Sequence, residues 1–342
     1  MLLTSVAAAS AQDQQAFDLN TRGLDAMSHG DNVEAVGLLE AAINLWRGLG
    51  PTYEAHLATT QANLAQALSA QGKRREAVNT YEVSLAGFRH SLGGENLNSV
   101  TVQNLLGANL LMLGEDSRAA ALLDEAASIE RRLYPNDVQL ARSLAGQSLL
   151  CLRARRIQDA LPLAEEAMRI VLKAEGDSGL DAALAYSDVA EVHRMAGRPE
   201  RALPLYKKAL ALYEQVLGRN HPRIASILSQ EGLILMDEGK LSLAEKAMTQ
   251  SLDILKKVCP GCTFEMTVSE SNLGLLRMKQ GKYQEADRLL NHVVELQEQY
   301  GPRPGPQMAG TLRLLAKLRE KEQRHEDASQ LQKRADLIMA FR

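Results

Sequence analysis

Small residues recur along this chain at a fixed spacing. One alanine returns every 42 residues, with a single interval of 41, at Ala35, Ala77, Ala119, Ala160, Ala202, Ala244, Ala286 and Ala328. Glycine, alanine or serine stands twelve residues before each of them, and alanine or serine stands seven residues after, with Val293 as the exception. Larger apolar residues such as Leu64 and Leu68 lie around them at helical spacing. The pattern predicts eight copies of one helical unit.

A second series marks where each copy turns. Six copies carry a glycine midway between the first two series, at Gly30, Gly72, Gly114, Gly197, Gly239 and Gly281. The fourth and eighth copies carry Arg155 and Gln323 there. Because glycine tolerates the positive φ at which helices commonly end, each copy is predicted to be helix, turn, helix. In the sixth copy the two helices are expected over about 223–238 and 242–258.

The small residues predict how these helices pack. Two antiparallel helices approach closely only where neither carries a bulky side chain at the crossing. A single hairpin cannot bury its apolar faces, so the copies are expected to stack with mostly nearest-neighbour contacts. A length of 342 residues would ordinarily suggest about two domains of ~150 residues each. The repeat instead predicts one all-α solenoid over residues 13–342, with sixteen helices and no sheet.

The repeat resembles a known family. Helical hairpins with small residues at these three positions are similar to the tetratricopeptide repeat, and the 42-residue period resembles its kinesin-light-chain subtype. The junction Leu217-Gly218-Arg219-Asn220-His221-Pro222 resembles that subtype's linker. The resemblance implies a right-handed α-solenoid that binds a peptide or protein in its concave groove. The charged eighth copy and the apolar residues of its last helix leave self-association through that helix as a further expectation.

Composition narrows the function. Lys and Arg number 39 against 42 Asp and Glu, so no large positive field is present to attract nucleic acid. The longest uncharged run, 96–114, holds four asparagines and a glutamine, which disfavours a membrane span. None of the seven histidines forms a close ligand pair, and no phosphate-loop, nucleophile-elbow or dinucleotide motif occurs. We therefore expect no catalytic residue, no metal and no cofactor.

The first residues leave the compartment open. Residues 1–12 are a possible remnant of a signal peptide, because the apolar stretch 1–11 ends in Ala9-Ser10-Ala11, which is typical of a secretory cleavage site, although the usual basic start is missing. The alternative is a frayed start of the first helix. The pattern favours an exported or periplasmic location, with the cytoplasm as the alternative.

One local motif contains residues that could be chemically reactive. Cys259-Pro260-Gly261-Cys262 replaces the usual junction between two copies. In an exported protein we expect a disulfide between Cys259 and Cys262 without catalytic turnover. Inert loop thiols are the alternative, and redox or metal chemistry is a further one, although no second ligand pair completes a zinc site. Cys151 lies near the small-residue series and is predicted to be a core residue.

The predicted groove lies on one face of the first helices. In the sixth copy that face carries small polar residues along one edge and methionine along the other. Asparagine and serine can bond an extended backbone, and methionine adapts to varied apolar groups. The candidate partner-binding residues are Asn63, Asn104, Met112, Asp188, Met195, Ser229, Met236, Asn272 and Met278. The alternative is that the polar residues merely face solvent while methionine packs in the core.

These observations favour a non-catalytic scaffold that binds a peptide or helix of an unidentified partner protein. One alternative is a redox or metal-binding module built on Cys259 and Cys262. Another is a structural solenoid that assembles with itself.

Overall fold

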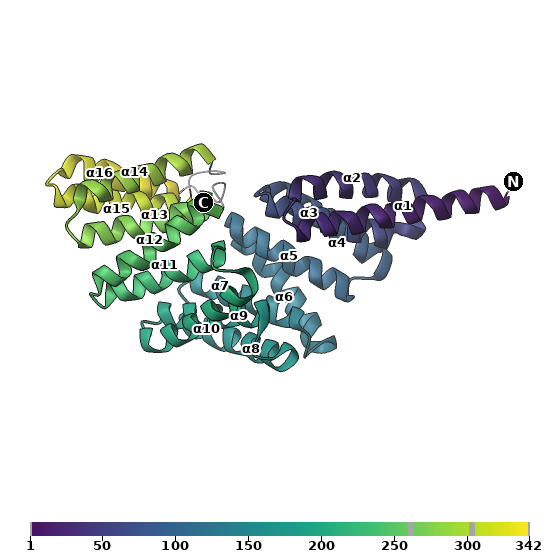
Figure 1. The fold of residues 1–342 in the computed structure, drawn as a ribbon, viewed down its shortest axis with the longest axis horizontal. Coiled ribbons are helices and arrows are strands. Elements are labelled where there is room, and N and C mark those ends of the chain that lie inside the picture. Colours follow the sequence, from purple (N-terminus) through teal and green to yellow (C-terminus); the bar gives the residue numbers. More distant parts are fainter. Residues whose placement is uncertain (1, 259–262, 301–304, 341–342) are drawn as a thin grey trace. The chain divides into compact units, whose positions relative to one another are not determined.

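The computed structural model describes residues 2–258, 263–300 and 305–340 of the chain (Figure 1). These residues divide into two compact units, Met1–Asp177 and Ser178–Arg342. Each unit is described by itself, so the expectation of one continuous superhelix over 13–342 stays a prediction.

Unit 1 is a stack of four helical hairpins. Its helices are α1 (Leu2–Ser28), α2 (Asn32–Leu49), α3 (Glu54–Ala70), α4 (Arg74–Leu92), α5 (Leu97–Leu113), α6 (Asp116–Leu133), α7 (Val138–Arg153) and α8 (Ile157–Glu175), with a short 3-10 turn η1 (Pro51–Tyr53) before α3. The apolar stretch at the start of the chain forms part of α1, but the side chains of residues 2–10 lie outside the description.

Unit 2 repeats the same arrangement. Its helices are α9 (Gly179–Met195), α10 (Pro199–Leu217), α11 (Pro222–Asp237), α12 (Leu241–Val258), α13 (Thr263–Lys279), α14 (Tyr283–Tyr300), α15 (Pro306–Lys321) and α16 (His325–Ala340). No strand occurs in the described ranges of either unit. The prediction of an all-α solenoid built from hairpins is confirmed, and the two helices of the sixth copy lie within two residues of their predicted ends.

The predicted turns lie where the backbone requires them. All six midway glycines have positive φ, between 69° and 83°. Arg155 and Gln323 adopt the same left-handed conformation, with φ of 61° and 60°, although a side chain disfavours it. The register of the repeat, rather than glycine itself, therefore identifies the turn in the fourth and eighth copies.

The small residues hold the two helices of each hairpin together. A methyl group added at Gly107 would lie 3.0 Å from the side chain of Leu123, and one added at Gly232 would lie 2.6 Å from that of Met248. Where the small residue is Ser148, its hydroxyl donates a hydrogen bond to the Ala160 carbonyl at 2.9 Å. The crossings are thus as close as predicted, and they leave no room for a larger residue.

Each unit has an inner layer of first helices. In unit 1, α1 contacts α3, α3 contacts α5 and α5 contacts α7, and in unit 2, α11 contacts α13 and α13 contacts α15. No comparable contact joins successive second helices within the described parts of either unit. A stack whose first helices pack closely while its second helices meet only through long side chains curves around the first helices. We call their exposed side, on α1, α3, α5 and α7 or on α9, α11, α13 and α15, the first-helix face.

Candidate functional site

The first-helix face of unit 1 is partly apolar. Leu24 on α1, Met112 on α5 and Leu149 on α7 are each about two-fifths exposed. Met112 thus has the accessible side chain that the groove hypothesis requires. Scattered apolar residues are common on protein surfaces, so this face alone identifies no ligand.

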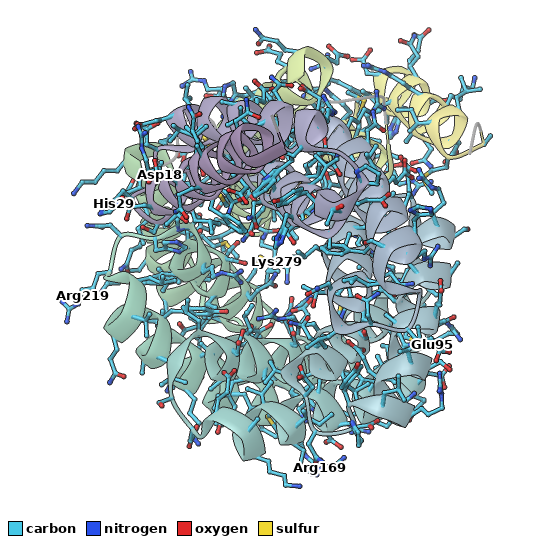
Figure 2. The ribbon with its side chains drawn as sticks, turned by 90° about the vertical axis from the view of Figure 1, so that its right-hand side faces the viewer. Asp18, His29, Glu95, Arg169, Arg219 and Lys279 are labelled. Carbon is cyan, nitrogen blue, oxygen red and sulfur yellow. The ribbon has the colours of Figure 1, made fainter. Side chains whose placement is uncertain are left out.

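The first-helix face of unit 2 is more charged. Lys279 on α13, labelled in Figure 2, pairs with Asp237 on α11 at 3.1 Å. On α9, Arg194 donates two hydrogen bonds to the Glu191 carboxylate, at 2.6 and 2.8 Å. Met195 and Met278 are half-buried on this unit's first helices. In unit 1, Glu95 at the turn between the second and third copies, labelled in Figure 2, pairs with Arg132 on α6.

Several of the predicted polar residues join neighbouring copies. The Asn63 amide on α3 donates a hydrogen bond to Asn20 Oδ1 on α1 at 3.0 Å. In unit 2 the Asn272 amide on α13 donates to Ser229 Oγ on α11 at 2.9 Å. Each bond spans 43 residues of sequence, from one copy to the next. These side chains therefore already satisfy one another in the absence of a partner.

Three of the predicted groove residues are buried, so their assignment to an open surface is wrong. Asn104, Ser229 and Met236 are at most 5% exposed. Met236 packs in the core with Met248 of its own hairpin and Leu273 of the next copy. The physical reason is that a first helix inside the stack contacts its own second helix, the second helix of the preceding copy and a neighbouring first helix. Its open face is consequently narrower than a helical wheel of one isolated copy predicts.

Asn104 belongs to a buried polar ring with Ser143 and Glu130. Its amide donates to Glu130 Oε1 at 3.1 Å, and the Ser143 hydroxyl lies 2.6 Å from both Asn104 Oδ1 and Glu130 Oε2. A hydroxyl has one proton, so it can donate to only one of these two oxygens. If Ser143 donates to Asn104, a protonated Glu130 closes the ring by donating to Ser143. The neutral carboxyl therefore satisfies every member.

Burial favours the same protonation state. Glu130 is fully buried, and this burial raises the pKa of its carboxyl to about 7, although hydrogen bonds from Ser143 and Asn104 act in the opposite direction. Glu130 stands eleven residues after Ala119, a place where other copies carry Trp46, Phe88 or Tyr213. That departure from the repeat was the sequence signal for this site, and it was missed.

The same junction occurs in the first two copies with different chemistry. Trp46, the only tryptophan, is 1% exposed and donates its indole N–H to Thr60 Oγ1 at 3.0 Å. Its ring stacks on His56 at 5.3 Å. Trp46 and Thr60 occupy the repeat positions that Glu130 and Ser143 occupy two copies later. A hydrogen bond at these two positions is therefore a feature of the repeat in both places, formed by different residue types.

Asp188 differs from the other polar residues of the first-helix face. It lies half-buried on α9 and accepts no hydrogen bond from the described residues. Burial raises the pKa of its carboxyl to about 7, the charge of Arg223 lowers it, and the nearby Glu191 raises it. Arg223 itself lies over the Tyr213 ring, 5.7 Å from the centroid. A carboxylate held in this way has free acceptor capacity.

A compact network lies one helical turn along α9. The Tyr206 hydroxyl on α10 donates to Glu191 Oε2 at 2.6 Å, while Arg194 bonds the same carboxylate. Burial together with the Glu191 charge raises the pKa of Tyr206. The Glu191 carboxylate is therefore occupied by groups of its own hairpin, whereas Asp188 is not.

The other predicted chemistry is largely outside the described residues. Cys259 and Cys262 lie there, so their disulfide stays a prediction, as does the exported location. Cys151 is buried as predicted, and burial raises the pKa of its thiol. In the described ranges no three His, Cys, Asp or Glu side chains gather closely enough to hold a metal ion. No described helix combines the length and apolarity needed to cross a bilayer.

The last helix carries the apolar residues proposed for self-association. On α16, Leu337 is 58% exposed and Met339 is 38% exposed, while Ile338 packs against the core of its hairpin. Phe341 lies outside the described residues. Exposure alone identifies no partner, so self-association stays a prediction.

Comparisons with known proteins agree with this architecture. The model of the tetratricopeptide repeat matches residues 13–90, 181–257 and 265–335. No curated protein sequence matches the chain. Among solved structures, BtubC (BKLC) from P. vanneervenii is 19% identical, with a TM-score of 0.52 over 68% of this chain and 94% of that one.

Two further structures cover more of the chain. NprR in complex with its cognate peptide NprX is 17% identical, with a TM-score of 0.61 over 81% of this chain and 77% of that one. A Rap protein complexed with Competence and Sporulation Factor is 12% identical, with a TM-score of 0.66 over 97% and 98%. At these identities the likeness shows the fold alone.

Proposed function

Because the chain belongs to the tetratricopeptide repeat family, we propose that it is a non-catalytic binding protein that holds a peptide segment of a partner protein on the first-helix face of unit 2. The observation that carries the proposal is Asp188, a half-buried carboxylate without a hydrogen-bond donor among the described residues. NprR, a protein of similar fold, has been crystallised in complex with its cognate peptide NprX.

Asp188 would accept hydrogen bonds from the segment. Its ligand would be a Lys or Arg side chain or a backbone N–H, since an ionised carboxylate is an acceptor only. Met195 lies two helical turns further along the same face of α9 and would contact an adjacent apolar side chain. Asn63, Asn272 and Met112 remain candidate contacts, but Asn104, Ser229 and Met236 do not.

The raised pKa of Asp188 gives this site a pH dependence. A donor or cation from the ligand favours the ionised carboxylate, so protonation competes with binding. With a pKa of about 7, roughly nine-tenths of the carboxyl is ionised at about pH 8 and roughly one-tenth at about pH 6. We expect affinity to be about tenfold weaker at the lower pH.

The experiment selects displayed random peptides of ~15 residues on the full chain and measures their affinities by fluorescence anisotropy at both pH values. Peptides that bind unit 2 should carry Lys or Arg, and Asp188→Asn should weaken them while abolishing the pH dependence. Asp253→Asn makes the same charge change at an exposed position on α12 and should leave binding unchanged. Equal effects of the two variants would contradict the proposal.

A further inference from the structure

Ion pairs link successive second helices at a recurring pair of positions. Across α4 and α6, Arg89 donates to both oxygens of Glu125 at 2.8 Å. Across α6 and α8, Arg131 pairs with Glu166 at 3.1 Å. In each case the arginine stands twelve residues after the repeat alanine of one copy, and the glutamate stands six residues after that of the next. The same register would pair Arg47 on α2 with residue 83 on α4.

At the α2–α4 seam this link is absent because residue 83 is valine. Arg47 is exposed at the last turn of α2 and pairs with no carboxylate in the described part of the chain, while Val83 is 54% exposed. A second link fails at the same seam. Glu82 pairs with Arg118 between α4 and α6, whereas the equivalent residues here are Glu40 and Glu76, two acidic side chains that cannot form an ion pair.

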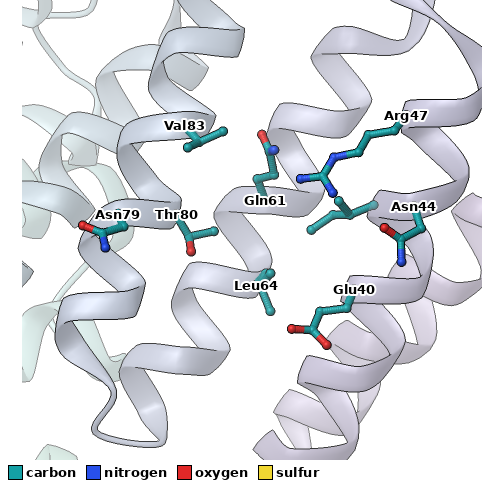
Figure 3. Close-up of a pocket in the computed structure, with 9 residues that line it drawn as sticks. Glu40, Asn44, Arg47, Gln61, Leu64, Asn79, Thr80 and Val83 are labelled. Atoms are coloured by element: carbon teal, nitrogen blue, oxygen red, sulfur yellow. The ribbon is translucent and has the colours of Figure 1, made fainter.

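An open pocket lies where these two links are missing. Its volume is about 390 Å³, with α2 and α4 as its walls and α3 as its floor (Figure 3). Arg47, Asn44 and Glu40 line it from α2, and Val83 lines it from α4. Leu64 and Gln61 form its floor. The pocket therefore combines two unlike charges with a floor that is part polar and part apolar.

Gln61 is a polar group that the pocket makes accessible to a ligand. Its side chain is on a residue only 6% exposed, and it makes no hydrogen bond to any described residue. Figure 3 shows the amide pointing into the space between Val83 and Arg47. The amide opens onto the pocket and is not sealed from solvent, so a ligand in the pocket can bond both its oxygen and its nitrogen. This observation is independent of the missing ion pairs, and it indicates the same pocket.

We propose that the α2–α4 seam binds a polypeptide segment of a partner protein. Its acidic side chain would pair with Arg47, in place of the missing carboxylate, and its basic side chain would pair with Glu40. Polar groups between them would bond Gln61, and an apolar side chain would cover Val83 and Leu64. The seam lies on the second helices of unit 1, so the inference goes beyond the peptide site proposed on the first-helix face of unit 2.

The spacing of the charges favours a polypeptide over a small zwitterion. Arg47 and Glu40 are seven residues apart on α2, which is about 10 Å along a helix. A segment with an acidic and a basic side chain roughly two helical turns apart spans that distance, whereas the charges of a free amino acid lie much closer together. Charge complementarity of this kind selects the register in which a segment docks.

The test uses displayed random peptides of ~15 residues, about 22 Å long as a helix, selected on the full chain. Enriched peptides are then measured by fluorescence anisotropy against the wild type and Val83→Glu. The new glutamate would pair with Arg47 as Glu125 pairs with Arg89, so it should close the seam. We expect peptides carrying the acidic and basic pair to bind Val83→Glu at least tenfold more weakly, with an unchanged or higher melting temperature.

Two further variants separate the seam from other surfaces. Val216→Glu makes the same substitution at an exposed position on α10 in unit 2 and should leave these affinities unchanged. Arg47→Glu should no longer bind the same peptides. Selection on this variant should enrich peptides with a basic residue in place of the acidic residue that pairs with Arg47. Peptides whose affinity is lowered by Asp188→Asn but not by Val83→Glu bind the first-helix face of unit 2. If no selected peptide distinguishes Val83→Glu from the wild type, the seam proposal is overturned.

Discussion

Two carboxyl groups in this chain share a raised pKa and differ in almost everything else. Glu130 in unit 1 and Asp188 in unit 2 both have a pKa of about 7, and burial is the main cause in each. Glu130 is fully buried and closes a ring with Asn104 and Ser143. Asp188 is half-buried and receives no hydrogen bond within the described residues.

The difference in hydrogen bonding between Glu130 and Asp188 distinguishes polar groups that hold the stack together from groups that can bind a ligand. A buried group whose hydrogen bonds are complete contributes to the specificity and stability of the stack and has nothing left to offer a ligand. A group whose partners are missing is costly to the folded protein and becomes favourable only when a ligand arrives. Similar pKa values thus hide opposite roles, and hydrogen bonding separates them.

The largest expected effect concerns the ionisation of Glu130. Its folded pKa is raised from 4.5 to about 7, so its stabilising contribution is complete below about pH 4.5 and is lost as pH rises through about 7. Glutamine mimics the protonated carboxyl, because its amide can donate to Ser143 while its carbonyl accepts from Asn104. Between about pH 5 and about pH 8, Glu130→Gln should gain about 2–3 kcal/mol of unfolding free energy relative to the wild type.

Urea unfolding followed by circular dichroism at both pH values measures this gain. The comparison is made between the two proteins at each pH, so titration of the remaining carboxylates cancels. A constant difference across the pH range would show that Glu130 is not protonated in the folded chain.

A smaller effect is expected from Asn104. Asn104→Ala leaves Glu130 and Ser143 without one partner each in a dry site, which should lower the free energy of unfolding by about 1–3 kcal/mol. Asn63→Ala is the matched control, since among the described residues the half-buried Asn63 amide has one recorded partner, Asn20, and the substitution should cost less than about 1 kcal/mol. If urea unfolding shows the same loss of unfolding free energy for both variants, the hydrogen bonds of Asn104 to Glu130 and Ser143 do not stabilise the fold.

The smallest effect on stability is expected at Asp188 in acid. At about pH 4 its carboxyl is neutral like the amide of asparagine, and Asp188→Asn removes no hydrogen bond made by the described residues, so the melting temperature of the full chain should change by less than about 2 °C. Because the folded pKa is raised from 3.8 to about 7, the variant should gain stability over the wild type only as pH rises through that range. The same variant is expected to alter peptide binding strongly. A large loss of stability with this substitution would show that Asp188, like Glu130, is part of the scaffold.

Most of the fold could be predicted from the sequence because the repeat is local. Ala202 and Gly232 recur in register with their equivalents, and both lie at close helix crossings. Even Arg155, a residue that disfavours positive φ, adopts the turn that the register assigns to it. Contacts within one hairpin are determined by residues a few turns apart, and the spacing of small residues records them directly.

The candidate site was less predictable because it depends on contacts between copies. Whether Asn104 faces solvent is decided by Ser143 and Glu130, which belong to the next copy and to the facing helix. A helical wheel of one copy holds no such information. The carboxylate at a position otherwise taken by Trp46 or Phe88 was the one visible signal, and it indicated a buried network rather than a groove.

The position of Trp46 makes the chain a selective optical reporter. Its indole is the only one in the sequence, it is buried at the junction of the first two copies, and it is fixed by Thr60 and His56. Selectively excited tryptophan emission therefore senses the junction where α1, α2 and α3 meet around Trp46, whereas the far-ultraviolet signal averages over all helices. In a stack held by nearest-neighbour contacts, the two signals measure the melting of one junction and of the whole array.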